Sequence, residues 1–156
     1  MPQGEIVIYT DGAARGNPGP GGLGVVMKYG NHRREISEGY ALTTNNRMEL
    51  LAVIRGLEAL KRNDLPVRIY TDSKYVSEAI NQGWVFNWEA KGFKKKKNVD
   101  LWQRFLVLYR KHTVKFIWVK GHANIPENER CDRLAVEASQ TGALKADKGY
   151  VENMDQ

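Results

Sequence analysis

Residues 8–12 read IYTDG and residues 69–73 read IYTDS, so two apolar, β-branched stretches end alike, each with an aspartate. Short runs of this composition predict strands buried within a sheet. In open α/β sheets, ligands bind at the carboxyl ends of the strands. If the two strands are parallel neighbours, Asp11 and Asp72 converge there, and their repulsion requires a proton or a cation between them. A helix cap or an Asx turn remains the alternative for either aspartate alone.

The rest of the chain places further strands and helices around this pair. Strands are predicted at 5–10, 23–28, 33–41, 67–71 and 114–119, and helices at 45–62, 73–81, 84–88, 99–111 and from Pro126 onward. The Gly- and Pro-rich stretch 12–22 is predicted to be a loop, and the polar third strand to lie at an edge. Three strands followed by alternating helices and strands predict a mixed α/β sheet with helices on both faces.

Smaller features of the chain add expectations about caps, core and ends. Asn45 is predicted to cap its helix, and Trp102 and Trp118 are predicted to lie in the core. From Thr141 onward the chain is polar, so residues 142–156 are expected to form a flexible tail.

The composition limits the class of protein. The chain has 156 residues, 42% of them hydrophobic and 27% charged, which predicts one folded domain spanning 1–156. A single cysteine, Cys131, excludes an internal disulfide and favours a reducing compartment. Apolar runs such as 50–54 are far shorter than the ~20 residues that span a bilayer, and the first residues do not resemble a secretory signal. We therefore expect a cytoplasmic, monomeric protein with no membrane contact and no obligate protein partner.

Much of the net charge of +6 is concentrated in one segment of the chain. Residues 84–104 hold six Lys and Arg residues against two acids, a net charge of +4. Residues 91–97 are expected not to pack and to project into solvent, and a solvated loop would be the ordinary explanation for their lysines. Aromatic residues flank them, however, and basic residues interleaved with aromatic rings suit nucleic-acid contact. Residues 84–98 are therefore a candidate basic protrusion.

Two further acids and one histidine complete the candidate site. Glu49 lies in TTNNRMEL and Asp132 in ENERCDRLA, each assigned to about the first turn of a helix, where the macrodipole alone would favour an acid. His122 lies in a predicted loop, where a histidine is more often solvated than catalytic. Four carboxylates with one histidine and one cysteine suit hard cations rather than zinc.

Five blocks of the chain, in order, resemble ribonuclease HI, the cellular type 1 ribonuclease H. They are YTDGAARGNPGPGG (9–22), TTNNRMELLA (43–52), YTDSKYV (70–76), NVDLWQR (98–104) after the basic stretch, and VKGHANIPENERCDRLA (119–135). The similarity extends over roughly 6–150. It implies the ribonuclease H-like fold, with five strands of which the first three are antiparallel.

The resemblance also implies an activity and a set of site residues. The activity is hydrolysis of the RNA strand of RNA–DNA hybrids with two Mg²⁺ ions, Mn²⁺ being the expected substitute, to 5′-phosphate and 3′-hydroxyl products with little sequence preference. The implied roles are metal binding by Asp11, Glu49, Asp72 and Asp132; proton movement by His122; RNA-strand contact by Asn17, Asn45 and Asn46; a DNA-phosphate pocket at Thr44 and Asn98; and a grip on the DNA strand by Trp84, Lys94, Lys95, Lys96 and Lys97.

Three departures and two rival interpretations accompany the resemblance. Ala13-Ala14-Arg15 replaces a more usual Ser-Cys pair. Lys74 follows TDS where family members usually carry Gln, and the lysine-dense stretch FKKKKNVD (93–100) is shorter than usual. A non-catalytic nucleic-acid binder would bind hybrids without cutting them. A related metal nuclease, such as an integrase or a Holliday-junction resolvase, would cut DNA.

Overall fold

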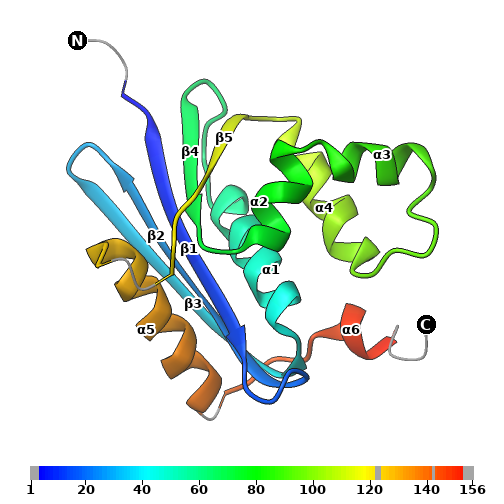
Figure 1. Ribbon diagram of the computed structural model, residues 1–156. Helices are drawn as coiled ribbons and strands as arrows, with labels where there is room; N and C mark the ends of the chain where they lie inside the picture. Colours follow the sequence, from blue (N-terminus) through cyan, green and yellow to red (C-terminus); the bar gives the residue numbers. More distant parts are fainter. Residues whose placement is uncertain (1–3, 122–123, 142, 153–156) are drawn as a thin grey trace.

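The computed structural model describes residues 4–121, 124–141 and 143–152 and contains a five-stranded mixed sheet (Figure 1). The strands are β1 (Ile6–Ala14), β2 (Gly19–Tyr29), β3 (His32–Thr43), β4 (Pro66–Thr71) and β5 (Thr113–Trp118), in the order β3-β2-β1-β4-β5. The first three strands are antiparallel, whereas β4 is parallel to both β1 and β5. The predicted mixed sheet and the polar edge strand are therefore confirmed.

Helices cover both faces of this sheet (Figure 1). They are α1 (Asn45–Glu58), α2 (Lys74–Asn81), α3 (Trp84–Ala90), α4 (Val99–Tyr109), α5 (Pro126–Gln140) and α6 (Lys148–Glu152). Helix α1 packs on β1 and β2 and carries α2 and α4 beside it, while α5 packs on β1, β2 and β3 from the opposite face. Among the described residues, no helix has the length and apolar character needed to cross a membrane.

The main core lies between the sheet and the α1 side. Ile8 and Ile69, paired across β1 and β4, are fully buried, as are Ile54 of α1 and Trp102 of α4. The prediction that Trp102 lies in the core is confirmed. Its polar edge is satisfied as well, because the indole Nε1 donates to the Tyr75 hydroxyl at 2.8 Å.

The glycine-rich stretch 12–22 is largely strand, which corrects the prediction of a loop. Ala13 pairs with Gly22, so the β1–β2 hairpin continues well past Asp11. The glycines serve packing as well as turning. A Cβ atom at Gly24 would lie 2.3 Å from the carbonyl oxygen of Cys131, so α5 lies directly on β2.

The cap of α1 and the positions of two acids within their helices differ from the sequence prediction. Thr44, not Asn45, is the N-cap of α1, and its hydroxyl accepts from the Arg47 backbone N–H at 3.2 Å. Glu49 and Asp132 both lie beyond the first turn of their helices, so the macrodipole does not explain them. The predicted cap at Ser73 is confirmed, since its side chain accepts from Val76 N–H.

Trp118 is not a core residue, contrary to its alternation with Phe116. It is the last residue of β5, beyond the part of the strand that the helices cover, and its side chain is 42% exposed. The indole Nε1 donates to the Asp72 carbonyl oxygen at 3.0 Å, and the Lys74 ammonium lies 5.1 Å from the ring centre. A tryptophan expected inside the protein therefore borders the aspartate-bearing end of the sheet.

The expected flexible tail over 142–156 is also corrected where the structure describes it. Lys145 pairs with Tyr40 at the outer edge of β3 in a parallel bridge, and Ala41 N–H donates to the Lys145 carbonyl at 2.8 Å. Beyond it, α6 lies near the start of α1 (Figure 1), and Asp147 is only 6% exposed. Polar composition suggested solvation, but these polar groups have buried partners.

Candidate active site

The two matching strand ends meet as predicted. Ile8 of β1 pairs with Ile69 of β4 in a parallel register, which brings Asp11 and Asp72 to the same part of the sheet. One carboxylate oxygen each from Asp11, Asp72 and Glu49 lies within 4.8 Å of the others. Three acids that are distant in sequence therefore form one cluster.

Close packing of helices on the sheet supplies the other acids. A Cβ atom at Gly12 would lie 2.4 Å from the Met48 carbonyl carbon, so α1 contacts β1 directly and presents Glu49 beside Asp11. On the opposite face, α5 brings Asp132 to a small cleft of about 20 Å³. The residues that line this cleft are Asp11, Asp72, Gly121, Ile125, Asn128, Glu129 and Asp132.

Two polar side chains of this lining, those of Asn128 and Glu129, were not anticipated from the sequence. Asn128 and Glu129 precede Asp132 by four and three residues, the helical spacing that places side chains on one face. That spacing within ENERCD was the available signal. Asn128 Oδ1 is buried and has no hydrogen-bond partner within the described structure.

The electrostatics of the cluster are those of unneutralised acids. Burial, followed by the charges of Asp72 and Asp132, raises the pKa of Asp11 to about 7. Burial and the charges of Asp11 and Asp72 raise the pKa of Glu49 well above its usual value. Within the described ranges, no Lys or Arg forms an ion pair with Asp11, Glu49, Asp72 or Asp132.

Two carboxylate oxygen atoms without hydrogen-bond partners in the described part of the chain show whether the cluster could bind a metal ion. Glu49 Oε1 and Asp72 Oδ1 are buried without a hydrogen-bond partner among the described residues. Buried acceptors are almost always satisfied, so these two oxygen atoms are free to accept a proton or a bound cation. Carboxylate oxygens are the donors that Mg²⁺ and Mn²⁺ prefer. The residues present therefore fit a hard divalent cation.

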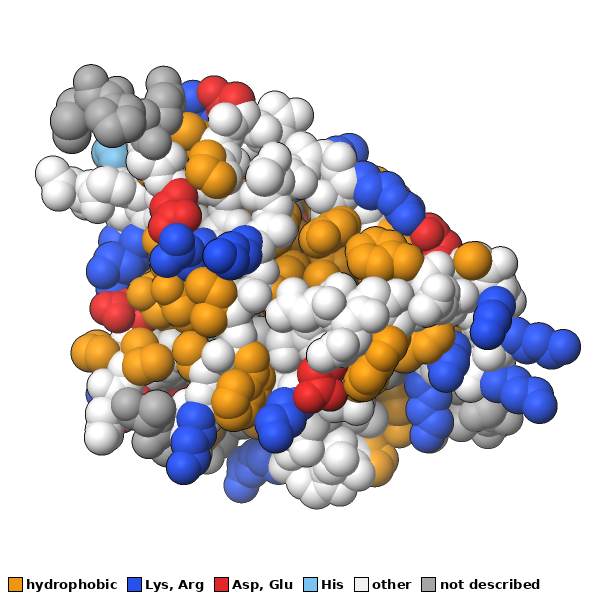
Figure 2. Space-filling model, turned by 45° about the horizontal axis from the view of Figure 1, so that its top comes forward, with side chains coloured by type: hydrophobic (Ala, Val, Ile, Leu, Met, Phe, Trp, Pro, Cys, Tyr) orange, Lys and Arg blue, Asp and Glu red, His pale blue; other side chains and the backbone are white. Residues whose placement is uncertain are grey.

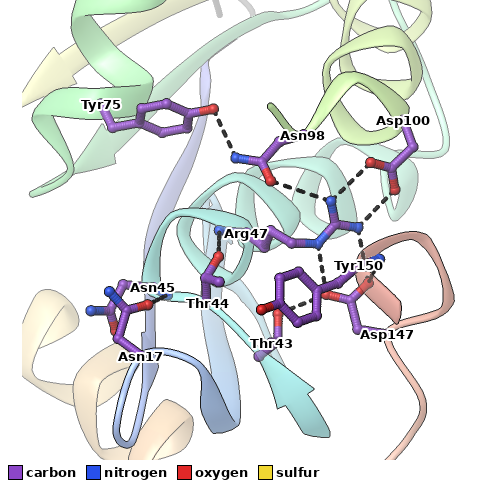
Figure 3. A network of polar contacts seen from close by, with 10 residues as sticks. All are labelled: Asn17, Thr43, Thr44, Asn45, Arg47, Tyr75, Asn98, Asp100, Asp147 and Tyr150. Atoms are coloured by element: carbon purple, nitrogen blue, oxygen red, sulfur yellow. Dashed lines mark hydrogen bonds and ion pairs between the residues drawn. The ribbon is translucent and has the colours of Figure 1, made fainter. Parts of the chain in front are cut away.

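The asparagines proposed for RNA contact are held by one another at the start of α1 (Figure 3). The Asn17 carbonyl oxygen accepts from the Asn45 backbone N–H at 2.9 Å, and the Asn45 carbonyl oxygen accepts from Ala14 N–H at 2.6 Å. These bonds orient both amide NH₂ groups as donors for another molecule. Asn46 is exposed beside them. His122 lies outside the described residues.

The basic protrusion forms a groove at the side of the molecule. Its cavity of about 530 Å³ is lined by Trp84, Asn87, Trp88, Lys91, Lys94, Lys95 and Lys96. Trp84 is 44% exposed, and the Lys96 ammonium lies 5.0 Å from the Trp88 ring centre. Phe93 is buried, which corrects the expectation that the whole stretch projects into solvent: one aromatic anchor secures an otherwise solvated run of lysines. Figure 2 shows cationic side chains gathered at this side.

Comparison with known proteins agrees with this geometry. The family model described as RNase H matches residues 3–140. The chain belongs to the RNase H family. A "Ribonuclease H" of Syntrophus aciditrophicus (strain SB) is 57% identical over 154 residues, covering 96% of this chain and 88% of that protein. A "Ribonuclease H" of Aeromonas hydrophila is 50% identical over 151 residues, covering 94% and 97%.

Solved structures of the family share the fold. LC9-RNase H1, described as a type 1 RNase H with the type 2 active-site motif, superposes with a TM-score of 0.78 at 32% identity, covering 100% of this chain and 83% of that one. LC11-RNase H1, solved with an RNA/DNA hybrid, gives a TM-score of 0.65 at 31% identity, covering 86% and 96%. The RNase H chain described here is therefore a nuclease, a hydrolase of phosphodiester bonds.

Proposed function

We propose that this RNase H is an endoribonuclease that hydrolyses the RNA strand of RNA–DNA hybrids and leaves 5′-phosphate and 3′-hydroxyl ends. The observation that carries this proposal is the half-buried cluster of Asp11, Glu49 and Asp72, with raised pKa values at Asp11 and Glu49 and oxygen atoms that lack partners among the described residues. The hybrid-bound structure of LC11-RNase H1 supports the choice of substrate.

In this proposal Asp11, Glu49, Asp72 and Asp132 hold two Mg²⁺ ions, with Mn²⁺ as a substitute. When bound, such ions activate water, neutralise the scissile phosphate and stabilise the leaving oxygen. The four carboxylates supply the oxygen ligands, and the buried position of Asp11 and Glu49 keeps these ligands apart from bulk water. His122, which follows Gly121 in the sequence, is assigned to proton movement at this site.

The RNA strand is recognised by its 2′-hydroxyl groups. A 2′-hydroxyl both donates and accepts, so it distinguishes RNA from DNA chemically. Asn17, Asn45 and Asn46 offer amide groups at the β1–β2 hairpin and the start of α1, and the first two are already oriented by hydrogen bonds. Amide pairs of this kind read a sugar without reading the base, which agrees with weak sequence preference.

The DNA strand is held by a phosphate pocket and by the basic protrusion. Thr44 and Asn98 are assigned to one phosphate, and Trp84 to a deoxyribose. The lysines 94–97 are all exposed and add affinity through counterion release, which carries no sequence information. We propose that the enzyme acts as a monomer in the cytoplasm.

Cleavage of one RNA sequence in different duplexes tests the proposal. The end-labelled RNA is presented as an RNA–DNA hybrid, as duplex RNA and as a single strand, each with Mg²⁺, with Mn²⁺ or with chelator, beside a DNA duplex. We expect cleavage of the hybrid alone, only with metal, leaving 3′-hydroxyl ends. Binding without cleavage would favour the non-catalytic alternative, and cleavage of the DNA duplex would favour the resolvase-like one.

A variant of the basic protrusion distinguishes substrate binding from the catalytic step. Replacement of Lys94, Lys95, Lys96 and Lys97 by Ala leaves the carboxylates untouched, so we expect a higher KM, a weaker salt dependence and a nearly unchanged kcat. A large fall in kcat with an intact KM would contradict a role in binding.

A further inference from the structure

Arg47 is a buried cation whose hydrogen-bonding capacity is used completely (Figure 3). The residue is 2% exposed. Its Nε and Nη2 donate to the Asp147 carboxylate at 2.8 and 2.9 Å, and its Nη1 and Nη2 donate to Asp100 at 2.8 and 2.7 Å. The remaining Nη1 donor reaches Asn98 Oδ1 at 3.4 Å. All five N–H groups of the guanidinium therefore have acceptors.

Asp147 holds this guanidinium from the segment that follows α5. Besides Arg47, its carboxylate accepts from the Thr43 hydroxyl at 2.6 Å and from the Tyr150 backbone N–H at 3.4 Å. The side chain of Asp147 is 6% exposed, whereas that of Asp100 is 38% exposed. We call Arg47 and the two carboxylates that hold it, those of Asp100 and Asp147, the Arg47 clamp. Asp147 is the more deeply buried of the two acids, and it lies 100 residues from Arg47 in the sequence.

Arg47 in turn fixes the two residues assigned to the DNA-strand phosphate. Its backbone N–H donates to the Thr44 oxygen, which leaves the hydroxyl hydrogen of Thr44 available to another acceptor. Its side chain donates to Asn98 Oδ1, and Asn98 Nδ2 donates to the Tyr75 hydroxyl at 3.0 Å. A second Nδ2 hydrogen of Asn98 remains. Asn98 also has a positive φ of 61°, so its side-chain bonds secure an uncommon backbone conformation.

We propose that Asp147 is a positioning residue for substrate binding: with Asp100 it holds the Arg47 side chain, whose guanidinium positions Asn98 while the backbone N–H of the same residue positions Thr44, for one phosphate of the DNA strand. The proposal rests on the function proposed above, since it needs a hybrid substrate. It assigns the segment after α5 a part in recognising the strand that is not cut.

The negative charge of Asp147 and its positioning of Arg47 predict opposite effects of an Asp147 substitution on substrate binding, so the two can be distinguished by experiment. The clamp contains two carboxylates and one guanidinium, so it has a net negative charge beside a phosphate site. If charge alone mattered, neutralising Asp147 would strengthen binding of the anionic substrate. If position matters, the same change weakens binding, because an amide NH₂ in place of one carboxylate oxygen would face an Arg47 donor.

The experiment compares Asp147→Asn with the wild-type chain on hybrids that each carry one uncharged methylphosphonate in the DNA strand. For wild type we expect one position at which the methylphosphonate raises KM about tenfold, the loss expected for a hydrogen bond to a charged group. For Asp147→Asn we expect a KM already raised about tenfold on the unmodified hybrid, with kcat nearly unchanged. The methylphosphonate at the sensitive position should then raise its KM less than about twofold.

Glu58→Gln is the matched control. Like Asp100, Glu58 takes part in an ion pair that links α1 to α4. Its carboxylate accepts from Arg55 of α1 and from Arg104 of α4. Glu58 is the last residue of α1, at the other end of the helix from Arg47. We expect this variant to lose thermal stability while its KM keeps the wild-type response to the methylphosphonate. Each variant is assayed well below its own Tm, so a loss of stability alone does not move KM.

A second variant leaves every charge in place. A Cβ atom at Gly149 would lie 1.9 Å from Asp100 Oδ2, so Gly149→Ala should displace the clamp and raise KM in the same direction. This variant also carries the test if Asp147→Asn fails to fold.

Three results would overturn the assignment. They are an unchanged or lower KM for a folded Asp147→Asn, an undiminished response of that variant to the methylphosphonate, and a wild-type enzyme that responds at no position. Failure of wild type to cut any hybrid would instead contradict the proposed function itself.

Discussion

The molecule compensates two groups of acidic side chains in opposite ways. Asp11, Glu49 and Asp72 stand together without a cation, and burial with mutual repulsion raises the pKa of Asp11 to about 7. Asp100 and Asp147 stand on either side of Arg47. Burial alone would raise the pKa of Asp100, but hydrogen bonds and charge from Arg47 hold it below the ordinary value.

This difference distinguishes a candidate functional site, the cluster of Asp11, Glu49 and Asp72, from a structural ion pair, the Arg47 clamp. A carboxylate with its own guanidinium needs nothing further, whereas acids that face one another need a proton or a cation from outside. Folding has therefore stabilised one acid group and left the other incomplete, which is the pattern expected where a protein gives up stability for function.

Neutralising one acid of the cluster should give the largest effect. We expect Asp11→Asn to lower the rate of hybrid cleavage at least about 1,000-fold, or ~4 kcal/mol, because a metal ligand is lost. Hybrid affinity should persist, and Tm measured in chelator should rise because repulsion is relieved. A variant that unfolds would show instead that Asp11 is structural.

Truncating one acid of the clamp should lower the stability, whereas Asp11→Asn should raise it. Asp147→Ala leaves the buried Arg47 guanidinium short of two acceptors, so we expect the free energy of unfolding to fall by about 3–5 kcal/mol. Urea denaturation measures it. A cost below about 1 kcal/mol would mean that water replaces the lost carboxylate, and the contrast between the two groups would not hold.

The pH dependence of stability in chelator should reveal the cluster, against a smaller opposing contribution from His112, whose pKa is lowered by burial. The folded-state pKa of Asp11, about 7, exceeds its ordinary value of 3.8, so the folded chain binds more protons between these values. Stability should therefore rise by a few kcal/mol at most as the pH falls from 8 to 5. The pKa of Asp100 is lowered, so its contribution is lost only below pH 4. The rise should be much smaller in Asp11→Asn and should disappear from wild type when Mg²⁺ saturates the site.

The smallest effect is expected at Lys74, a cation beside the cluster that the Trp118 ring holds. Lys74→Gln should raise KM for the hybrid about twofold, leave kcat unchanged, and reduce the slope of log(kcat/KM) against log salt by about 1, the value for one phosphate contact. An unchanged slope would mean that Lys74 touches no phosphate. Lys61→Gln, at an exposed position beyond α1, is the control.

What the sequence could predict depended on how local the signal was. Asp11 and Asp72 were predicted to converge because two strands end in the same five-residue pattern. The position of Trp118 was wrong because alternation tells which face a side chain takes, not whether a helix covers that face. The Arg47 clamp was missed although Arg47 and Asp100 lie within two of the family blocks, because Asp147 belongs to no motif and its burial depends on a segment whose polar composition suggested solvent.

Gly12 and Gly24 have a consequence for protein engineering. They contain no reactive group, yet each leaves room for an acid-bearing helix to lie directly against the sheet. A designer who transplants Asp11, Glu49, Asp72 and Asp132 onto another α/β scaffold must transplant this spacing too. Four correct side chains on a scaffold with an alanine at either position would stand too far apart to share an ion.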